Sequence, residues 1–250
     1  MTILSDGPAE AQRLVAAAQE AGLLLRLVGG LAVRLHSPSA THRSLARAYP
    51  DLDYVTNEKR SDRLEKFFTG QGYQPNKTFN LLNGDRRLLF WDEGNSRQID
   101  IFVGRFHMCH TIPVTGRLAL DPLTLPLAEL LLTKMQIVEM NEKDIRDQCA
   151  LLLDHPLWEG DVEMINLPLI AGLCAEDWGL WKTVMVSAQK VRTYCESHDL
   201  DAGQKQTLIE RLDRLSQALE GAPKSLRWRV RARVGERVQW YELPEEVRRG

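Results

Sequence analysis

The chain has 250 residues, of which 44% are hydrophobic and 26% charged, a composition that is typical of a folded globular protein and excludes a largely disordered one. Its formal net charge is −2, so the whole chain does not attract nucleic acid or anionic lipid, and any such binding needs a local basic patch. The sequence has neither the basic start and apolar core of a signal peptide nor a run of about 18 apolar residues, and we therefore expect a cytoplasmic protein with no membrane partner.

The N-terminal part of the chain alternates between helix and strand patterns. The expected elements are, in order, a helix over 8–21, a strand over 23–28 that stops at Gly29-Gly30, a helix over 31–36, a strand that carries Asp51 and Asp53, and a helix over 61–72 with Ser61 as its N-cap. Apolar stripes of helical spacing and buried apolar runs distinguish the two kinds of element.

Three more strands are expected next, with sequences KTFNLLN, RRLLFW and RQIDIFV, over 77–83, 86–91 and 97–103. The tripeptide Asn-Gly-Asp between the first two is a strong hairpin signal. An alternation of helices and strands followed by a β-meander predicts an α/β fold with a mixed sheet and helices packed against it, rather than a doubly wound parallel sheet.

From about residue 111 the pattern becomes helical, with expected helices near 126–139, 142–154, 176–197 and 203–220. We predict two domains, an α/β domain over 1–115 and an all-helical domain over 120–250 that closes the active-site cleft. The boundary is placed between residues 111 and 125, in a loop.

Three features of the first domain point to phosphate and metal chemistry. Asp51 and Asp53 would face the same way on one strand, about 6.6 Å apart along the backbone, where they repel each other unless a cation lies between them. The Gly29-Gly30 turn before a helix lets backbone N–H groups approach an anion such as a triphosphate. Asp100 adds a third carboxylate from another strand, and three such groups can hold two divalent ions.

These pieces, LVGGLAVRLH, PDLDYV and QIDIFV, resemble the nucleotidyltransferase superfamily related to DNA polymerase β, and the segment from Leu125 to His155 is similar to that of predicted AbiEii-like nucleotidyltransferases. The resemblance implies a mixed-sheet nucleotidyltransferase fold in which Asp51, Asp53 and Asp100 bind two Mg²⁺ ions. It also implies that Asp100 holds the catalytic metal and helps to activate the acceptor hydroxyl, and that Lys134 reaches the nucleotide.

The chain departs from the family pattern at the diglycine and before the first aspartate. Twenty residues separate Gly30 from Asp51, which is more than the usual short spacing, and Pro50 precedes Asp51. Gly30 stands where many members have Ser, so a side-chain contact to phosphate is missing there. The family's substrate contacts in this loop therefore do not transfer.

A purely structural role is the alternative to nucleotide binding for Lys134, Asp144 and Asp147. Lys134 could be a surface lysine whose aliphatic stem packs on apolar neighbours. Lys143 and Asp147 have the spacing of an ordinary helical ion pair. Alternatively, Asp144 and Asp147 orient Lys134 for the nucleotide, as supporting groups do around a metal or a phosphate.

The segment from Lys224 to Arg233 concentrates positive charge near the end of the chain. As a strand its arginines would share one face, whereas as a helix Leu226, Val230, Val234 and Val238 form an apolar stripe, which favours the helix. Either form could hold RNA phosphates or the nucleotide. Pairing of the arginines with acids such as Glu236, Glu242 and Glu245 is the alternative.

The predicted function is therefore Mg²⁺-dependent transfer of a nucleoside monophosphate from an NTP to a hydroxyl of tRNA, a protein or a small molecule, with release of pyrophosphate. The family resemblance also raises membership of a toxin–antitoxin pair. The alternative is a non-catalytic nucleotide-binding or antitoxin-like regulatory module with the same fold.

Overall fold

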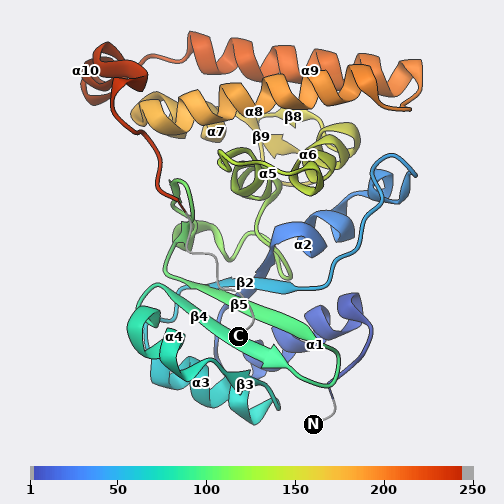
Figure 1. The fold of residues 1–250 in the computed structure, drawn as a ribbon, viewed down its shortest axis with the longest axis vertical. Helices are drawn as coiled ribbons and strands as arrows, with labels where there is room; N and C mark the ends of the chain where they lie inside the picture. Colours follow the sequence, from blue (N-terminus) through green and yellow to red (C-terminus); the bar gives the residue numbers. More distant parts are fainter. Residues whose placement is uncertain (1–2, 244–250) are drawn as a thin grey trace. The chain divides into compact units, whose positions relative to one another are not determined.

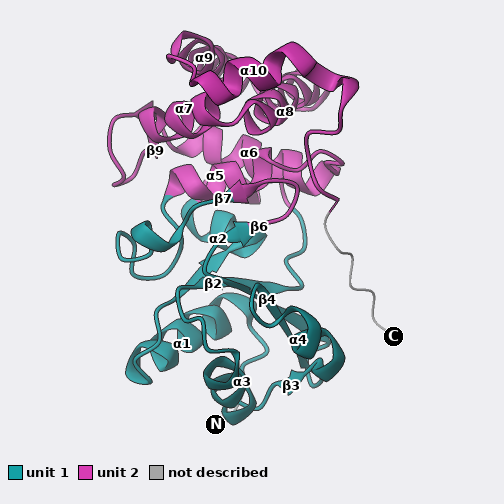
Figure 2. Cartoon of the chain, turned by 90° about the vertical axis from the view of Figure 1, so that its left-hand side faces the viewer, with its two compact units in different colours: residues 1–36, 47–106, 112–126 teal, residues 37–46, 107–111, 127–250 magenta. Residues whose placement is uncertain are grey.

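A computed structural model describes residues 3–243. The chain forms two compact units, coloured separately in Figure 2: residues 1–36, 47–106 and 112–126, and residues 37–46, 107–111 and 127–250. Residues 37–46, which the sequence places in the first domain, thus cluster with the second unit. There Ser39 donates hydrogen bonds from its backbone N and its Oγ to Asp154, at 2.9 and 2.6 Å.

The first unit is built on a five-stranded mixed sheet with the strand order β1-β2-β5-β4-β3. β2 and β5 are parallel, and the other neighbouring pairs are antiparallel. The strands are β1 (Leu25–Val28), β2 (Leu52–Thr56), β3 (Gln74–Pro75), β4 (Arg87–Asp92) and β5 (Arg97–Val103). The α/β fold with a mixed sheet is confirmed.

Helices cover both faces of this sheet. They are α1 (Gly7–Glu20), α2 (Gly29–His36), α3 (Ser61–Gly70) and α4 (Lys77–Asn83). Figure 1 shows α1 and α3 on one face and α2 on the other. On the α3 side, Phe68 stacks on Phe90 of β4 with ring centroids 4.9 Å apart, and Tyr54 and Tyr73 complete a fully buried aromatic core.

The predicted strand over 77–83 is wrong, because this segment is the helix α4. Asn76 caps the helix by accepting a hydrogen bond from the Phe79 backbone N at 3.1 Å. The buried Asn80 side chain bonds both the N and the O of Leu89 in β4, at 2.7 and 3.2 Å. A side chain thus takes the place of a strand along that part of the β4 edge.

The predicted Asn-Gly-Asp hairpin is wrong for the same reason, since Asn83 and Gly84 end α4. The hairpin lies one step later, between β4 and β5, where Asp92 accepts a hydrogen bond from the Asn95 backbone N at 3.2 Å. Ser61 is also not an N-cap. Arg60 occupies that position in extended conformation without a side-chain capping bond.

The second unit is mainly helical, as predicted. Its helices are α5 (Leu127–Met135), α6 (Glu142–Asp154), α7 (Leu167–Glu176), α8 (Trp178–Ser197), α9 (Ala202–Gly221) and α10 (Leu226–Val234). The sequence did not predict α7, and the expected helix over 126–139 is longer than α5, which ends at Met135. Asp177 separates α7 from α8 by capping the latter, accepting a hydrogen bond from the Leu180 backbone N at 3.1 Å.

The remaining elements are short. They are the strands β6 (Phe106–His107), β7 (Thr111–Ile112), β8 (Leu157–Trp158) and β9 (Ile165–Asn166) and the 3₁₀ turns η1 (Pro38–Thr41), η2 (Thr115–Arg117) and η3 (Gly235–Arg237). Among residues 3–243, none of the helices has the length and apolar content needed to cross a membrane.

Candidate functional site

The candidate site of the first unit lies where the parallel strands β2 and β5 run side by side. Asp53 of β2 is paired in register with Asp100 of β5, so the two Cα atoms are about 4.8 Å apart and their side chains share one face of the sheet. Asp100 is buried, Asp53 is half-buried, and Asp51 lies just before β2 and is exposed. The structure therefore brings together two of the three predicted carboxylates directly, with the third two residues away along the chain.

Gly29 places the start of α2 against Asp53. Val28, the last residue of β1, is paired with Asp53, and Gly29 then turns the chain with a φ of +74°. A Cβ atom at position 29 would collide with Oδ2 of Asp53. Only glycine accommodates both this backbone conformation and the carboxylate. The N-terminal end of a helix favours a nearby negative charge, so the start of α2 is a favourable place for a carboxylate.

Replacing Gly29 with Ala is therefore expected to displace the Asp53 carboxylate and to lower the nucleotide transfer that the sequence predicts at least tenfold, besides the backbone cost of about 1–2 kcal/mol for a left-handed alanine. Gly22→Ala is the matched control. Gly22 has a φ of +68°, and a Cβ there would meet only the flexible end of Arg63, at 3.5 Å. Urea unfolding measures the stability of both variants, and nucleotide-transfer assays measure their activity. Equal activity of the two variants would mean that Gly29 does not position Asp53.

Arg47 covers the second glycine of the pair. A Cβ atom on Gly30 would collide with the guanidinium of Arg47, and that guanidinium also stacks over Tyr49, 4.2 Å from the ring centroid. A positive group thus lies at the N-terminal end of α2, where the sequence predicts phosphate binding. Sequence reasoning missed Arg47, although a basic residue four positions before Asp51 was a usable signal.

Arg87 of β4 holds Asp100. Its Nε donates to Oδ1 at 2.8 Å and its Nη2 forms a short ion pair with Oδ2, the two-pronged geometry that arginine makes with a carboxylate. Burial raises the pKa of Asp100 above its ordinary value, and the pairing with Arg87 opposes that shift. Sequence reasoning missed Arg87, because the contact depends on the register between β4 and β5.

The carboxylates suit a magnesium ion only in part. Asp51 and Asp53 supply the hard oxygen ligands that Mg²⁺ prefers. Asp100 offers both of its oxygens to Arg87. In the described part of the chain, no group of three or more histidine, cysteine, aspartate or glutamate side chains is arranged to hold a metal ion. Binding of two Mg²⁺ ions by all three aspartates stays a prediction.

The other predicted site residues form a buried charge cluster within the second unit. The Lys134 Nζ on α5 lies 3.2 Å from Oδ1 of Asp144 and 2.8 Å from Oδ2 of Asp147, both on α6. All three residues are buried. Asp147 thus contacts Lys134, which is a buried lysine and not a surface one. Whether Lys134 reaches a nucleotide stays a prediction.

The basic segment forms α10, as the apolar stripe predicts, but the helix ends at Val234, so Val238 lies beyond it in extended conformation. The stripe faces solvent. Leu226 is 71% exposed and Val230 54%. Ser225 caps the helix, accepting a hydrogen bond from Trp228 N at 3.2 Å. Of the three acids proposed as partners of the arginines, Glu236 pairs with Lys182 at 2.5 Å and Glu242 with His107 at 3.0 Å. Glu245 lies outside the described residues.

Comparison with known proteins adds a partial structural likeness. No protein-family model and no curated protein matches the chain. The crystal structure of an antigenic nucleotidyltransferase-like protein from Paracoccidioides brasiliensis is similar at 14% identity, over 87% of this chain and 94% of that chain, with a TM-score of 0.41. At this level the likeness assigns no activity, substrate or residue role to this chain.

Proposed function

We propose that the chain is a nucleotidyltransferase that moves a nucleoside monophosphate from an NTP to an acceptor hydroxyl. The observation that carries the proposal is the in-register pairing of Asp53 with Asp100 on parallel strands, with Gly29 at the start of α2 against Asp53. Carboxylates beside a glycine turn and a helix N-terminus combine groups for a cation with groups for phosphate.

In the proposed reaction the oxygen of the acceptor hydroxyl forms a bond to the α-phosphorus of the NTP. The bond from that phosphorus to the bridging oxygen breaks, and pyrophosphate leaves with its electron pair. The hydroxyl proton passes to Asp100 and then to water. Catalysis of this kind consists mainly of positioning and charge stabilisation.

Each residue of the site has a place in this reaction. Asp51 and Asp53 would hold Mg²⁺, which supplies a positive charge for the phosphate oxygens. Gly29 and Gly30 let the backbone of α2 approach the triphosphate. Arg47, which lies on Gly30, would bind its terminal phosphates.

Transfer of radioactive label tests the proposal. Purified chain is incubated with Mg²⁺, each of the four α-³²P-labelled NTPs in turn, and pools of RNA, protein or small hydroxyl compounds. Label on an acceptor together with equimolar pyrophosphate is the expected result, and the class that becomes labelled identifies the acceptor. Absence of both products with every acceptor pool would contradict the proposal.

A nucleotide-binding module without turnover is the second candidate, and one observation favours it. Arg87 occupies both oxygens of Asp100, the carboxylate that the family resemblance assigns to the catalytic metal. Such a module would bind an NTP, as measured by calorimetry, and release no pyrophosphate.

RNA is the acceptor that α10 suits best, because Arg227, Arg229 and Arg233 are all exposed on it. Changing these three residues to Gln is expected to weaken binding of a short single-stranded RNA at least tenfold and to flatten the salt dependence by about 0.7 per lost phosphate contact. Fluorescence polarisation measures both effects.

The matched control removes three exposed lysines of the first unit, Lys59, Lys66 and Lys77. It changes the net charge by the same amount and should leave RNA affinity within about twofold. Equal losses in the two triple variants would mean that net charge, and not α10, determines binding.

A further inference from the structure

The second unit contains a cavity of about 1070 Å³ beside α10, a volume at the upper end of those of ligand sites. Its walls come from α10, the start of α8 and the segments 239–242 and 107–111, all of which belong to this unit. Figure 2 shows α10 beside α7 and α8. The apolar stripe of α10 forms one wall of the cavity. The stripe is therefore exposed because it faces an open cavity.

Aromatic side chains gather at this cavity. Four of the six tryptophans of the chain are found here: Trp178, Trp228 and Trp240 line it, and Trp181 packs edge-on against Trp228 with ring centroids 5.3 Å apart. Tyr241 adds a fifth ring. Trp178 is buried, whereas Trp228, Trp240 and Tyr241 are half-buried. The cavity thus has apolar ring surface that a flat aromatic ligand can cover.

The rings are held in place by contacts within the unit. The Trp240 Nε1 donates a hydrogen bond to Oγ1 of Thr183 on α8, at 3.1 Å. The Arg231 Cζ lies 4.7 Å from the ring centroid of Trp178, and its Nη1 donates to the Gly235 carbonyl at 2.6 Å. Because the walls are already fixed, a ligand pays little for ordering them.

The charges around the cavity differ between its outside and its lining. Five basic residues and no acidic one lie between 224 and 233, so the outer surface of α10 complements a polyanion and repels a cation. Glu176 and Asp177 line the cavity and are exposed. Their carboxylates repel a phosphate and can accept hydrogen bonds from the amino group of a nucleobase. This arrangement favours a neutral aromatic group inside the cavity and its phosphates outside.

We propose that the cavity binds one unpaired nucleobase of a single-stranded RNA whose phosphates lie on the exposed arginines of α10. The base stacks on the half-buried rings, and its sugar lies on the apolar stripe. Stacking on aromatic side chains and basic surface along the backbone are the two components of single-strand recognition. The inference rests on the proposed function only for the role of this RNA as the acceptor.

Tryptophan fluorescence of the full chain tests the inference. A short oligoadenylate RNA is expected to quench the fluorescence as it binds. Inorganic polyphosphate of equal charge has no bases, so it should bind at least about fivefold more weakly and leave the fluorescence unchanged. Binding of oligoadenylate without quenching, or equal affinity for the two polymers, would overturn the inference. The cavity would then be left for another class of partner, such as an apolar peptide.

Trp240→Leu supplies the second test, because it removes one ring surface and keeps an apolar side chain. The affinity for oligoadenylate should fall at least about fivefold. The slope of its salt dependence should not change, because stacking releases no counterions. Loss of the arginines of α10 flattens that slope, so the two kinds of contact are distinguishable.

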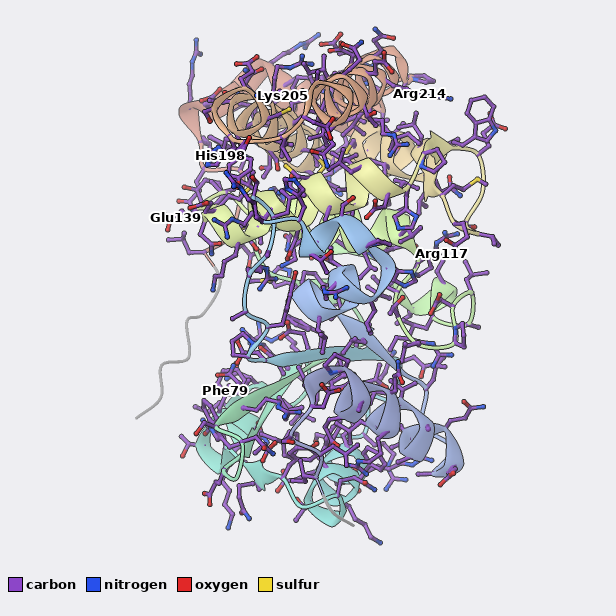
Figure 3. All side chains as sticks on the ribbon, turned by 90° about the vertical axis from the view of Figure 1, so that its right-hand side faces the viewer. Phe79, Arg117, Glu139, His198, Lys205 and Arg214 are labelled. Atoms are coloured by element: carbon purple, nitrogen blue, oxygen red, sulfur yellow. The ribbon has the colours of Figure 1, made fainter. Side chains whose placement is uncertain are left out.

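Trp158→Leu is the matched control. Trp158 belongs to the same unit, is 55% exposed and does not line the cavity. Arg214, labelled in Figure 3, lies over its ring with Cζ 4.4 Å from the centroid. This variant should keep the quenching and an affinity within about twofold of the parent. Equal losses in Trp158→Leu and Trp240→Leu would overturn the inference.

Tyr241→Leu covers the case in which Trp240→Leu does not fold, because Tyr241 is half-buried and lies outside the helices. It should also lose at least about fivefold in affinity, and a folded variant with the parent affinity would overturn the inference. These measurements contain no NTP. Transfer to RNA with unchanged affinity in both variants would refute the inference alone. Reduced affinity in both, with no transfer to any acceptor, would refute the proposed function and support the cavity as an RNA site.

Discussion

Replacing Asp53 with Asn is expected to reduce nucleotide transfer by more than about 100-fold, which corresponds to at least about 2.7 kcal/mol of transition-state stabilisation. The amide keeps the size and hydrogen-bonding ability of the side chain but removes the charge that would bind the cation. Because charge on the transferring phosphate group is greatest in the transition state, the loss should be seen mainly in kcat. Steady-state assays of pyrophosphate release measure it.

The same substitution should leave the free energy of unfolding within about 1 kcal/mol of the parent value. Asp53 gains from the N-terminus of α2, an effect of about 0.3–1 kcal/mol, and it suffers repulsion from the neighbouring carboxylates Asp51 and Asp100, so the two contributions oppose each other. Urea unfolding tests this expectation.

Asp85→Asn, a substitution of an exposed acid in the same unit, is the control and should change neither activity nor stability. Full NTP turnover in Asp53→Asn combined with marked destabilisation would show that Asp53 is a structural acid. The nucleotidyltransferase proposal would then be wrong.

The parts of the site that could be predicted from sequence are those that depend on local patterns. A diglycine after an apolar run, two aspartates with one residue between them and an aspartate in a later strand can each be read without a fold. Their expected proximity needed only the assumption of one sheet. The structure pairs Asp53 with Asp100 in that sheet.

The parts that could not be predicted depend on contacts between distant segments. Arg87 meets Asp100 because β4 and β5 are paired in one particular register, and no spacing rule within either strand gives that register. Arg47 reaches Gly30 from the far end of a long loop. The sequence therefore predicted the acids of the site but not the two arginines beside them. Both arginines change the charge of the site.

The error at α4 also has a physical origin. A seven-residue segment with alternating apolar residues is compatible with a strand or a short helix, and periodicity alone does not decide between them. The outcome depends on Asn76 as a cap and on Asn80, whose side chain bonds the backbone of Leu89 nine residues later. Leu81, which the strand reading would place in the core, is 86% exposed.

Replacing Lys134 with Met is expected to destabilise the protein by about 3–5 kcal/mol, the range observed when one member of a buried ion cluster is removed. The Lys134 ammonium lies within 3.2 Å of Asp144 and within 2.8 Å of Asp147. Methionine fills the same space without a charge, so two buried carboxylates lose their shared cation. The melting temperature should fall by about 6–20 °C.

Two further variants separate loss of charge from loss of packing. Lys143→Met changes the exposed lysine beside Asp144 on the same helix and should shift the melting temperature by less than about 2 °C. The triple variant Lys134→Met, Asp144→Asn, Asp147→Asn removes both stranded charges together with the ammonium and should recover at least half of the lost stability, because a neutral cluster has a smaller desolvation cost.

The stability and the NTP affinity of these variants also distinguish a structural role of Lys134 from a role in nucleotide binding. If the triple variant is stable and still binds an NTP as tightly as the parent, the three residues form a structural cluster that joins α5 to α6 and do not reach the nucleotide. If it is stable but its KM for the NTP rises tenfold or more, Lys134 contacts the substrate and the aspartates orient it. If Lys134→Met alone is as stable as the parent, the buried ion cluster does not form in solution, and both interpretations fail.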